Sequence, residues 1–263
     1  MSLREHLQEL RNRVLVSAVA VLLGAVVGWF LYEPLIEALK QPLDEVSEQR
    51  GSLATLNYGD IASPFNLKLK LSVYLGIVIA SPVWLYQTWA FVVPGLTRKE
   101  RRNALAFVAA AVPLFASGLL LAWFVLPNAV HFLTDFTPEG AVNIVSADAY
   151  LTFVTRIMLA FGVAFVIPLF LVALDAVGLV TAATLVRGWR IAVFLSFLFA
   201  AIASPSPDAG SMIALAVPIV ALYFVALGVA WFMDRRRGRR REQALRDLPD
   251  DRAAPLDDPA DPL

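Results

Sequence analysis

Long apolar runs without charged side chains are the feature that most constrains this chain. Residues 14–32 form one such run, and others recur as far as about residue 233. About 20 apolar residues, each rising about 1.5 Å along a helix, cross the roughly 30 Å hydrocarbon core of a bilayer. Hydrophobic residues make up 59% of the sequence, and the 17% that are charged lie mainly between the runs. The sequence therefore predicts an all-α polytopic membrane protein.

Six transmembrane helices are expected, and their approximate ranges are 14–32, 71–93, 104–126, 150–174, 191–203 and 212–233. The last two, helices 5 and 6, are expected to be short. The fifth has only about 13 residues, so it needs local membrane thinning or protein cover. Pro82 is expected to kink the second span, since proline removes a backbone donor from the helix. Residues 33–70 are polar, and a connection of that length usually contains structure of its own.

The distribution of basic residues predicts the orientation. Of the 22 Lys and Arg residues, 17 fall on the side that carries both termini and 5 on the other. Basic residues favour the cytoplasmic side, so the N- and C-termini are predicted to be cytoplasmic. Residues 1–233 are expected to form one membrane domain. Residues 234–263 form a tail that is first basic and then rich in Asp and Pro, and it is expected to be disordered.

Several function classes lack the residues they require. The chain has no Cys and only two His residues, so a thiolate or histidine metal site is not expected. It contains no phosphate-binding loop, zinc-protease or serine-hydrolase motif. No charged residue lies in the middle of a span, which argues against a conventional ion-coupled carrier. We therefore expect no enzymatic activity, no cofactor, no metal and no nucleic-acid partner.

Two carboxylates are the candidates for ligand binding. Glu100 is the one acidic residue in the basic turn at 98–102, and Glu9 lies in the polar segment before the first span. A pair of carboxylates could hold a guanidinium group through bidentate hydrogen bonds. Each could instead form an internal ion pair, Glu9 with Arg13 and Glu100 with a neighbouring base. The residues alone leave both interpretations open.

Two further patterns also have two interpretations each. Gln87 lies near the end of the second span, where it could hydrogen-bond to another helix or reach the lipid headgroups. Gly24 and Gly28 form a G-x-x-x-G pair in the first span, which favours a close helix contact but also occurs in ordinary packing.

Six segments, in chain order, resemble the TatC subunit of the twin-arginine protein translocase. They are HLQELRNR (6–13), the loop that contains Pro42, ASPF (62–65), SPVWLYQTWAFVVPGLTRKERR (81–102), FGVAFVIP (161–168) and SPSPD (204–208). The resemblance implies a receptor in the bacterial cytoplasmic membrane that binds twin-arginine signal peptides at its cytoplasmic face. It also implies export of folded proteins driven by the proton motive force, single-span TatA/TatB-type partners, and self-association in the receptor complex.

The resemblance assigns roles to individual positions. Glu9 and Glu100 match the two family glutamates that contact the consecutive arginines of the signal peptide. Four more residues match positions important for function, and these are Arg11, Pro42, Phe91 and Asp208. Where this chain has Val166, the family often has a glutamate that is thought to face the single-span partner subunits. Val166 and Gln87 are therefore the candidate contacts with a partner subunit.

Two other functions remain compatible with the residues alone. The first is a small-solute membrane transporter or channel, and the second is a structural membrane scaffold. Peptide binding and solute flux distinguish them, because a transporter shows flux, a receptor binds peptide and a scaffold does neither.

Overall fold

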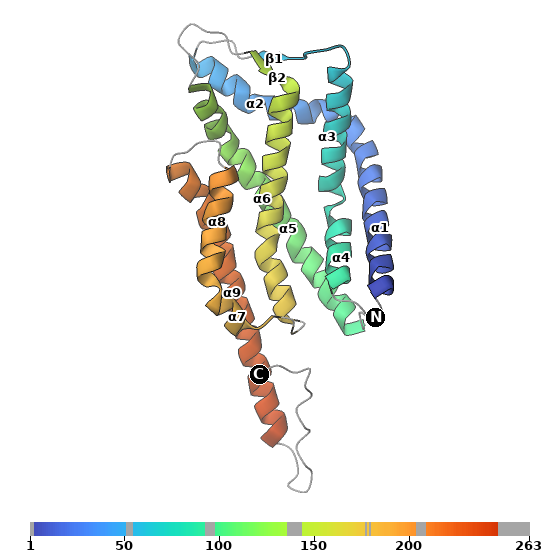
Figure 1. The fold of residues 1–263 in the computed structure, drawn as a ribbon, viewed down its shortest axis with the longest axis vertical. Coiled ribbons are helices and arrows are strands. Elements are labelled where there is room, and N and C mark those ends of the chain that lie inside the picture. The colour runs from blue at the N-terminus through green and yellow to red at the C-terminus, as the bar shows by residue number, and fades with distance from the viewer. Residues whose placement is uncertain are drawn as a thin grey trace.

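The computed structural model describes residues 3–50, 55–92, 98–135, 144–176, 178, 180–203 and 209–246. Within these ranges the chain is almost entirely helical (Figure 1). The elements are α1 (Leu3–Phe30), α2 (Tyr32–Arg50), β1 (Thr55–Asn57), α3 (Ser63–Ile79), α4 (Ser81–Val92), α5 (Arg98–Asp135), β2 (Ile144–Ser146), α6 (Ala147–Ala176), α7 (Ala182–Arg187), α8 (Trp189–Ala203) and α9 (Ala209–Arg246).

The described helices confirm the all-α polytopic membrane class. Four segments are long and apolar enough to cross a bilayer, and they lie in α1, α5, α6 and α9. The pair α3 and α4 could form a fifth span, broken by a bend of 59°. α8 is apolar but has only 15 residues, which make about 22 Å of helix. It is therefore short, as expected for the fifth span. The total of six spans stays a prediction.

The bend between α3 and α4 has a local cause. Pro82 is the second residue of α4, and its ring nitrogen cannot donate a helical hydrogen bond. The indole nitrogen of Trp84 donates to the carbonyl of Ile77 at 2.9 Å, so a carbonyl near the break is satisfied by a side chain. The predicted kink is therefore present at this proline.

Glycines bring α1 and α3 into backbone contact. A Cβ placed on Gly28 would lie 2.6 Å from the carbonyl oxygen of Ser72, and one on Gly24 would lie 2.9 Å from that of Gly76. A Cβ on Gly76 would in turn meet the backbone of Val21 at 2.5 Å. The G-x-x-x-G pair thus makes a close helix contact, which we call the α1–α3 glycine seam.

The polar connection after the first span has structure of its own. α2 crosses one end of the bundle, roughly perpendicular to the long helices (Figure 1). Its Leu39 and Leu43 are buried in a cluster with residues of α3, α5 and α6. The hydroxyl of the buried Tyr150 in α6 donates to the Leu39 carbonyl at 3.0 Å. β1 pairs in parallel with β2 at the same end.

The last helix corrects two expectations. α9 has 38 residues, and its segment Leu215–Arg236 satisfies the length and hydropathy of a full span, so this helix is not short. It also continues to Arg246, so the first part of the expected disordered tail is helical. Arginine favours helix, and the single Gly238 within the basic run does not end it. Residues 247–263 lie outside the described part of the chain.

Four features gather at the end of the bundle opposite α2. They are the start of α1, the end of α4 with the start of α5, the short α7 and the basic end of α9 (Figure 1). The N-terminus and the helical part of the tail are thus at the same end.

Candidate functional site

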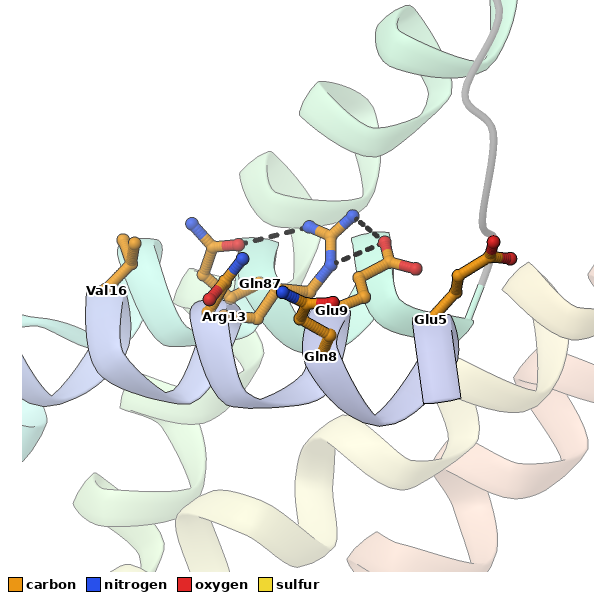
Figure 2. A pocket seen from close by; sticks show the side chains of 7 residues that line it. Glu5, Gln8, Glu9, Arg13, Val16 and Gln87 are labelled. Carbon is orange, nitrogen blue, oxygen red and sulfur yellow. Dashed lines mark hydrogen bonds and ion pairs between the residues drawn. The ribbon is translucent and has the colours of Figure 1, made fainter. Parts of the chain in front are cut away.

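A shallow groove lies along the first turns of α1 where that helix meets α4 (Figure 2). Its volume is about 470 Å³. All but one of its lining side chains are polar. The lining residues are Glu5, Gln8, Glu9, Asn12, Arg13, Val16 and Gln87. We call it the α1–α4 groove.

Glu9, Arg13 and Gln87 form a chain of hydrogen bonds in this groove. Arg13 Nε donates to Glu9 Oε1 at 3.0 Å, and Arg13 Nη2 forms an ion pair with the same oxygen at 2.5 Å. Arg13 Nη1 donates to Gln87 Oε1 at 3.1 Å, which joins α1 to α4. The predicted internal pair between Glu9 and Arg13 is therefore present, and Gln87 hydrogen-bonds across to another helix.

The Glu9 carboxylate keeps one oxygen available. Arg13 occupies Oε1, whereas Oε2 is buried and accepts no hydrogen bond from any described residue. The Glu9 side chain as a whole is 21% exposed, whereas Oε2 itself is covered, so a ligand has to displace neighbouring side chains to reach this oxygen. Because a buried acceptor without a donor costs about 1–3 kcal/mol, a donor supplied by a ligand would be favoured at this oxygen.

An aromatic stack fixes the same helix pair one turn further. The ring centroids of His6 and Phe91 are 4.5 Å apart, and the angle between the ring planes is 22°. Phe91 lies one turn beyond Gln87 on α4, so both residues face α1. The structure thus places Phe91 beside the groove, where it packs against the helix that carries Glu9.

Glu100 lies in the first turn of α5, a helix that begins at the same end of the bundle as α1 (Figure 1). Its side chain is outside the described residues. The first turn of a helix favours negative charge, because unpaired backbone N–H groups give that end a partial positive charge.

The remaining family positions are spread over the chain. Arg11 is exposed on α1, and its Nη2 makes a long, 3.4 Å contact with Asn12 Oδ1. Pro42 lies within α2 at the opposite end, and its side chain is outside the described residues. Asp208 also lies outside them. The structure therefore brings Gln87 and Phe91 together with Glu9 but does not bring Arg11 or Pro42 into the groove.

Val166 lies inside the chain's own packing. Its side chain is 7% exposed and belongs to a cluster with residues of α4 and α5. Its neighbours Val163 and Ile167 are 48% and 54% exposed, so they, unlike Val166, present their side chains at the surface of α6. A partner contact through Val166 itself stays a prediction, and the monomer offers it little surface.

Two features of the site were missed from the sequence. The stacking of His6 on Phe91 had no signal in the spacing, because it depends on how α4 meets α1. The sequence could show that Arg13 is able to reach Glu9, but not that the same guanidinium also reaches Gln87 on α4.

Comparisons with known proteins agree with this architecture. The profile of the family described as Sec-independent protein translocase protein (TatC) matches residues 5–218. The TatC protein of Xylanimonas cellulosilytica is 51% identical over 244 residues, which are 93% of this chain and 88% of that protein. The chain belongs to the TatC family. The TatC protein of Aquifex aeolicus is 33% identical over 90% of this chain and 98% of its own length.

Solved TatC structures share the fold. A crystal structure described as the twin-arginine translocase receptor TatC superposes with a TM-score of 0.70 at 32% identity, covering 86% of this chain and 99% of that one. A second TatC receptor structure gives a TM-score of 0.68 at 31% identity. This TatC family member is therefore a multi-pass membrane protein of a protein-translocation system.

Proposed function

We propose that this chain is the receptor subunit of a twin-arginine translocase and binds twin-arginine signal peptides in the α1–α4 groove. The observation that supports the proposal is that the two Glu9 oxygens differ, since Arg13 donates to Oε1 whereas Oε2 is buried and receives no hydrogen bond from the described part of the chain. An arginine of the signal peptide would supply that donor. Glu100, in the first turn of α5, would contact the second arginine.

Arg13 acts as a positioning residue in this proposal. Its guanidinium is held by Glu9 on one side and by Gln87 on the other, so the Glu9 side chain is kept in one orientation before a peptide arrives. A carboxylate whose rotamer is already fixed loses less conformational entropy on binding. A peptide arginine is preferred over lysine, because a planar guanidinium donates several hydrogen bonds in a fixed geometry.

The two charged contacts cannot account for the whole affinity. Each is worth about 1.5–3 kcal/mol when well formed, so two give at most about 6 kcal/mol. Micromolar binding needs about 8 kcal/mol. We therefore propose that the apolar segment of the signal peptide also packs on the bundle, along α3–α4 and from α6 to α8.

The wider setting follows from the family. The proposed location is the bacterial cytoplasmic membrane, with the α1–α4 groove and both termini on the cytoplasmic side, as the basic residues predict. Export of folded proteins would require TatA/TatB-type single-span partners and the proton motive force. Self-association within the receptor complex is also proposed.

Site-specific crosslinking tests the receptor proposal. A photoreactive group at position 9 or 100 is expected to crosslink a twin-arginine peptide and not a twin-lysine peptide. Glu9→Gln and Glu100→Gln should each weaken binding, while Glu37→Gln, an exposed glutamate on α2 at the other end, should not. Unchanged binding in both the Glu9→Gln and the Glu100→Gln variant would refute the roles assigned to these residues. Solute flux through the purified protein in liposomes would favour a transporter instead.

A further inference from the structure

A second groove runs along the bundle between α6 and α8, and its polar mouth lies at the end opposite the α1–α4 groove. One part of it has a volume of about 810 Å³ and a polar mouth at Lys70, Asp148 and Arg156. The other part, about 730 Å³, is lined almost entirely by apolar side chains of α6, α8 and α9. Ala160 and Phe199 line both parts, so the two parts adjoin, and we call them together the α6–α8 groove.

A single face of α6 runs the length of this groove. Its lining residues recur at helical spacing, from Thr152 and Arg156 through Ala160 to Ile167 and Leu171. The first two are polar and the rest are apolar. From residue 156 to residue 171 the face is about 22 Å long, more than the roughly 15 Å of one leaflet's hydrocarbon.

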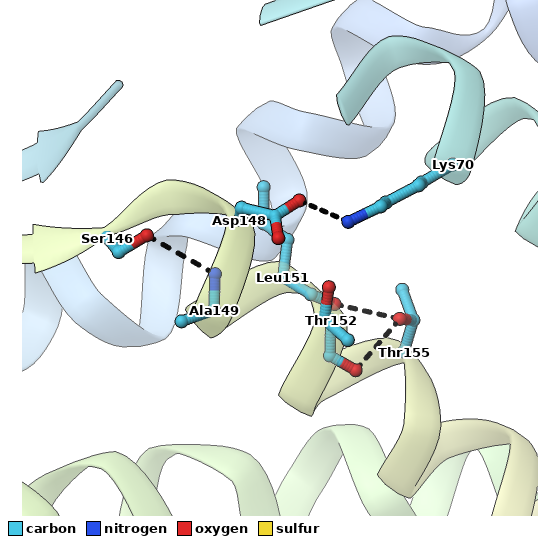
Figure 3. A network of polar contacts seen from close by, with 7 residues as sticks. All are labelled: Lys70, Ser146, Asp148, Ala149, Leu151, Thr152 and Thr155. Carbon is cyan, nitrogen blue, oxygen red and sulfur yellow. Dashed lines mark hydrogen bonds and ion pairs between the residues drawn. The ribbon is translucent and has the colours of Figure 1, made fainter. Parts of the chain in front are cut away.

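Among the residues that the structure describes, the polar mouth carries one cation without a partner, Arg156. Lys70 forms an ion pair with Asp148 at 2.5 Å, between side chains that are 53% and 44% exposed (Figure 3). Arg156 is also exposed, and none of the described residues forms a hydrogen bond or ion pair with it. The three charges leave the mouth with a net charge of about +1 at neutral pH. This end of the groove therefore suits an anion.

The short α8 ends close to Arg156. Ile202, the second-last residue of α8, lines the same cavity as Arg156. About 22 Å of α8 cannot match a hydrocarbon core of roughly 30 Å, so either the bilayer thins beside it or protein covers the mismatch. Arg156 lies nine residues, or about 14 Å, along α6 from Ala147, and thinning beside α8 would let lipid headgroups descend to it.

We propose that the α6–α8 groove binds one anionic phospholipid while no signal peptide, whose apolar segment is proposed above to pack from α6 to α8, occupies it. Its phosphate contacts Arg156 at the mouth, and one acyl chain lies along the apolar face towards Leu171. Thr152 lies one turn before Arg156 and can donate to the same phosphate, whereas the Thr155 hydroxyl is already bonded to the carbonyls of Leu151 and Thr152 (Figure 3).

The length and chemistry of the groove favour a lipid over a free anion. Inorganic phosphate would use Arg156 alone and leave the apolar face unoccupied. An acyl chain contributes about 0.8 kcal/mol for each CH₂ it buries, although its release from the bilayer offsets most of this term. The contact with the charged headgroup therefore selects anionic over zwitterionic phospholipids. The apolar groove selects a ligand with an acyl chain over a free anion.

Native mass spectrometry of the detergent-solubilised protein tests this proposal. Phosphatidylglycerol and phosphatidylcholine are titrated in parallel, and the lipids that remain bound are counted. One phosphatidylglycerol is expected to remain in preference to phosphatidylcholine, and excess inorganic phosphate should not displace it. Arg156→Gln should weaken this retention about fivefold or more, as expected for loss of a partly exposed charged contact.

Two further variants separate the charge from the groove. Arg190→Gln makes the same change at the opposite end of α8 and should leave the retained lipid in place. Ala160→Trp fills the junction between the two parts without changing charge, and it should reduce retention while gel filtration shows a folded protein. Equal retention of both lipids, or no effect of Arg156→Gln, would overturn the proposal. So would a photoreactive group at position 199 that crosslinks a single-span protein and no lipid.

Discussion

Replacing Gly28 by Ala tests how firmly α1 is attached to the bundle. The new Cβ would lie 2.6 Å from the Ser72 carbonyl oxygen and 2.8 Å from the Leu75 Cβ, both on α3. Neither atom can rotate away, because one belongs to the backbone and the other is bonded directly to it. The two helices must therefore move apart by about 1 Å to restore an ordinary separation of about 3.5 Å.

The expected change in stability is the difference of two terms. Overpacking of this kind costs about 1–3 kcal/mol. Gly→Ala within a helix also gains about 0.5–1 kcal/mol from backbone entropy. Gly228→Ala is the matched control, because a Cβ at that position of α9 meets no atom within 4 Å and only the gain applies. The two variants should thus differ by about 1–3 kcal/mol.

Thermal unfolding in one detergent measures this difference. At about 2–4 °C per kcal/mol for a chain of this size, Gly28→Ala should unfold about 2–12 °C below Gly228→Ala. Gly24→Ala should fall between them, since its clash at 2.9 Å is milder. If Gly28→Ala is as stable as Gly228→Ala, α1 does not rest on α3 through its backbone and the assigned contact is wrong.

Three substitutions test the polar contacts. Arg13→Lys keeps the charge, but lysine cannot hydrogen-bond to Glu9 and Gln87 at once. We therefore expect twin-arginine peptide binding, measured by fluorescence anisotropy, to weaken severalfold. Unchanged binding would exclude a positioning role for Arg13. Trp84→Phe removes the donor at the α3–α4 bend and should cost about 1 kcal/mol of unfolding free energy, measured by thermal melting. Tyr150→Phe removes the hydroxyl that joins α6 to α2 and should cost a similar amount in the same assay, and no loss would mean that water replaces the bond.

The sequence was sufficient for features that depend on local physics. The apolar runs gave the membrane class, Pro82 gave the bend, and the spacing of Gly24 and Gly28 gave the close helix contact as one of two interpretations. It failed where segments cooperate at a distance. α2 is stabilised by burying Leu39 and Leu43 under other helices, and neither residue stands out within its polar segment.

The same distinction applies to the candidate site. The i, i+4 spacing predicted that Glu9 and Arg13 could pair, because both lie on one face of one helix. Whether the pair has further partners depends on α4, which brings Gln87 to Arg13. The second Glu9 oxygen receives no hydrogen bond from the described residues. Only the packing of α1 on α4 could show that this ion pair extends to a second helix through Gln87.

The length of α9 affects how cargo can approach. Residues 237–246 extend the helix about 15 Å beyond the apolar segment, and six arginines occupy residues 235–241. α9 packs on α6, α7 and α8, whereas the α1–α4 groove belongs to the other flank. Such a basic rod repels a positively charged leader within about 8 Å at physiological salt. If the chain is the receptor proposed above, a folded passenger bearing paired arginines would therefore approach along the α1 flank, away from the basic end of α9.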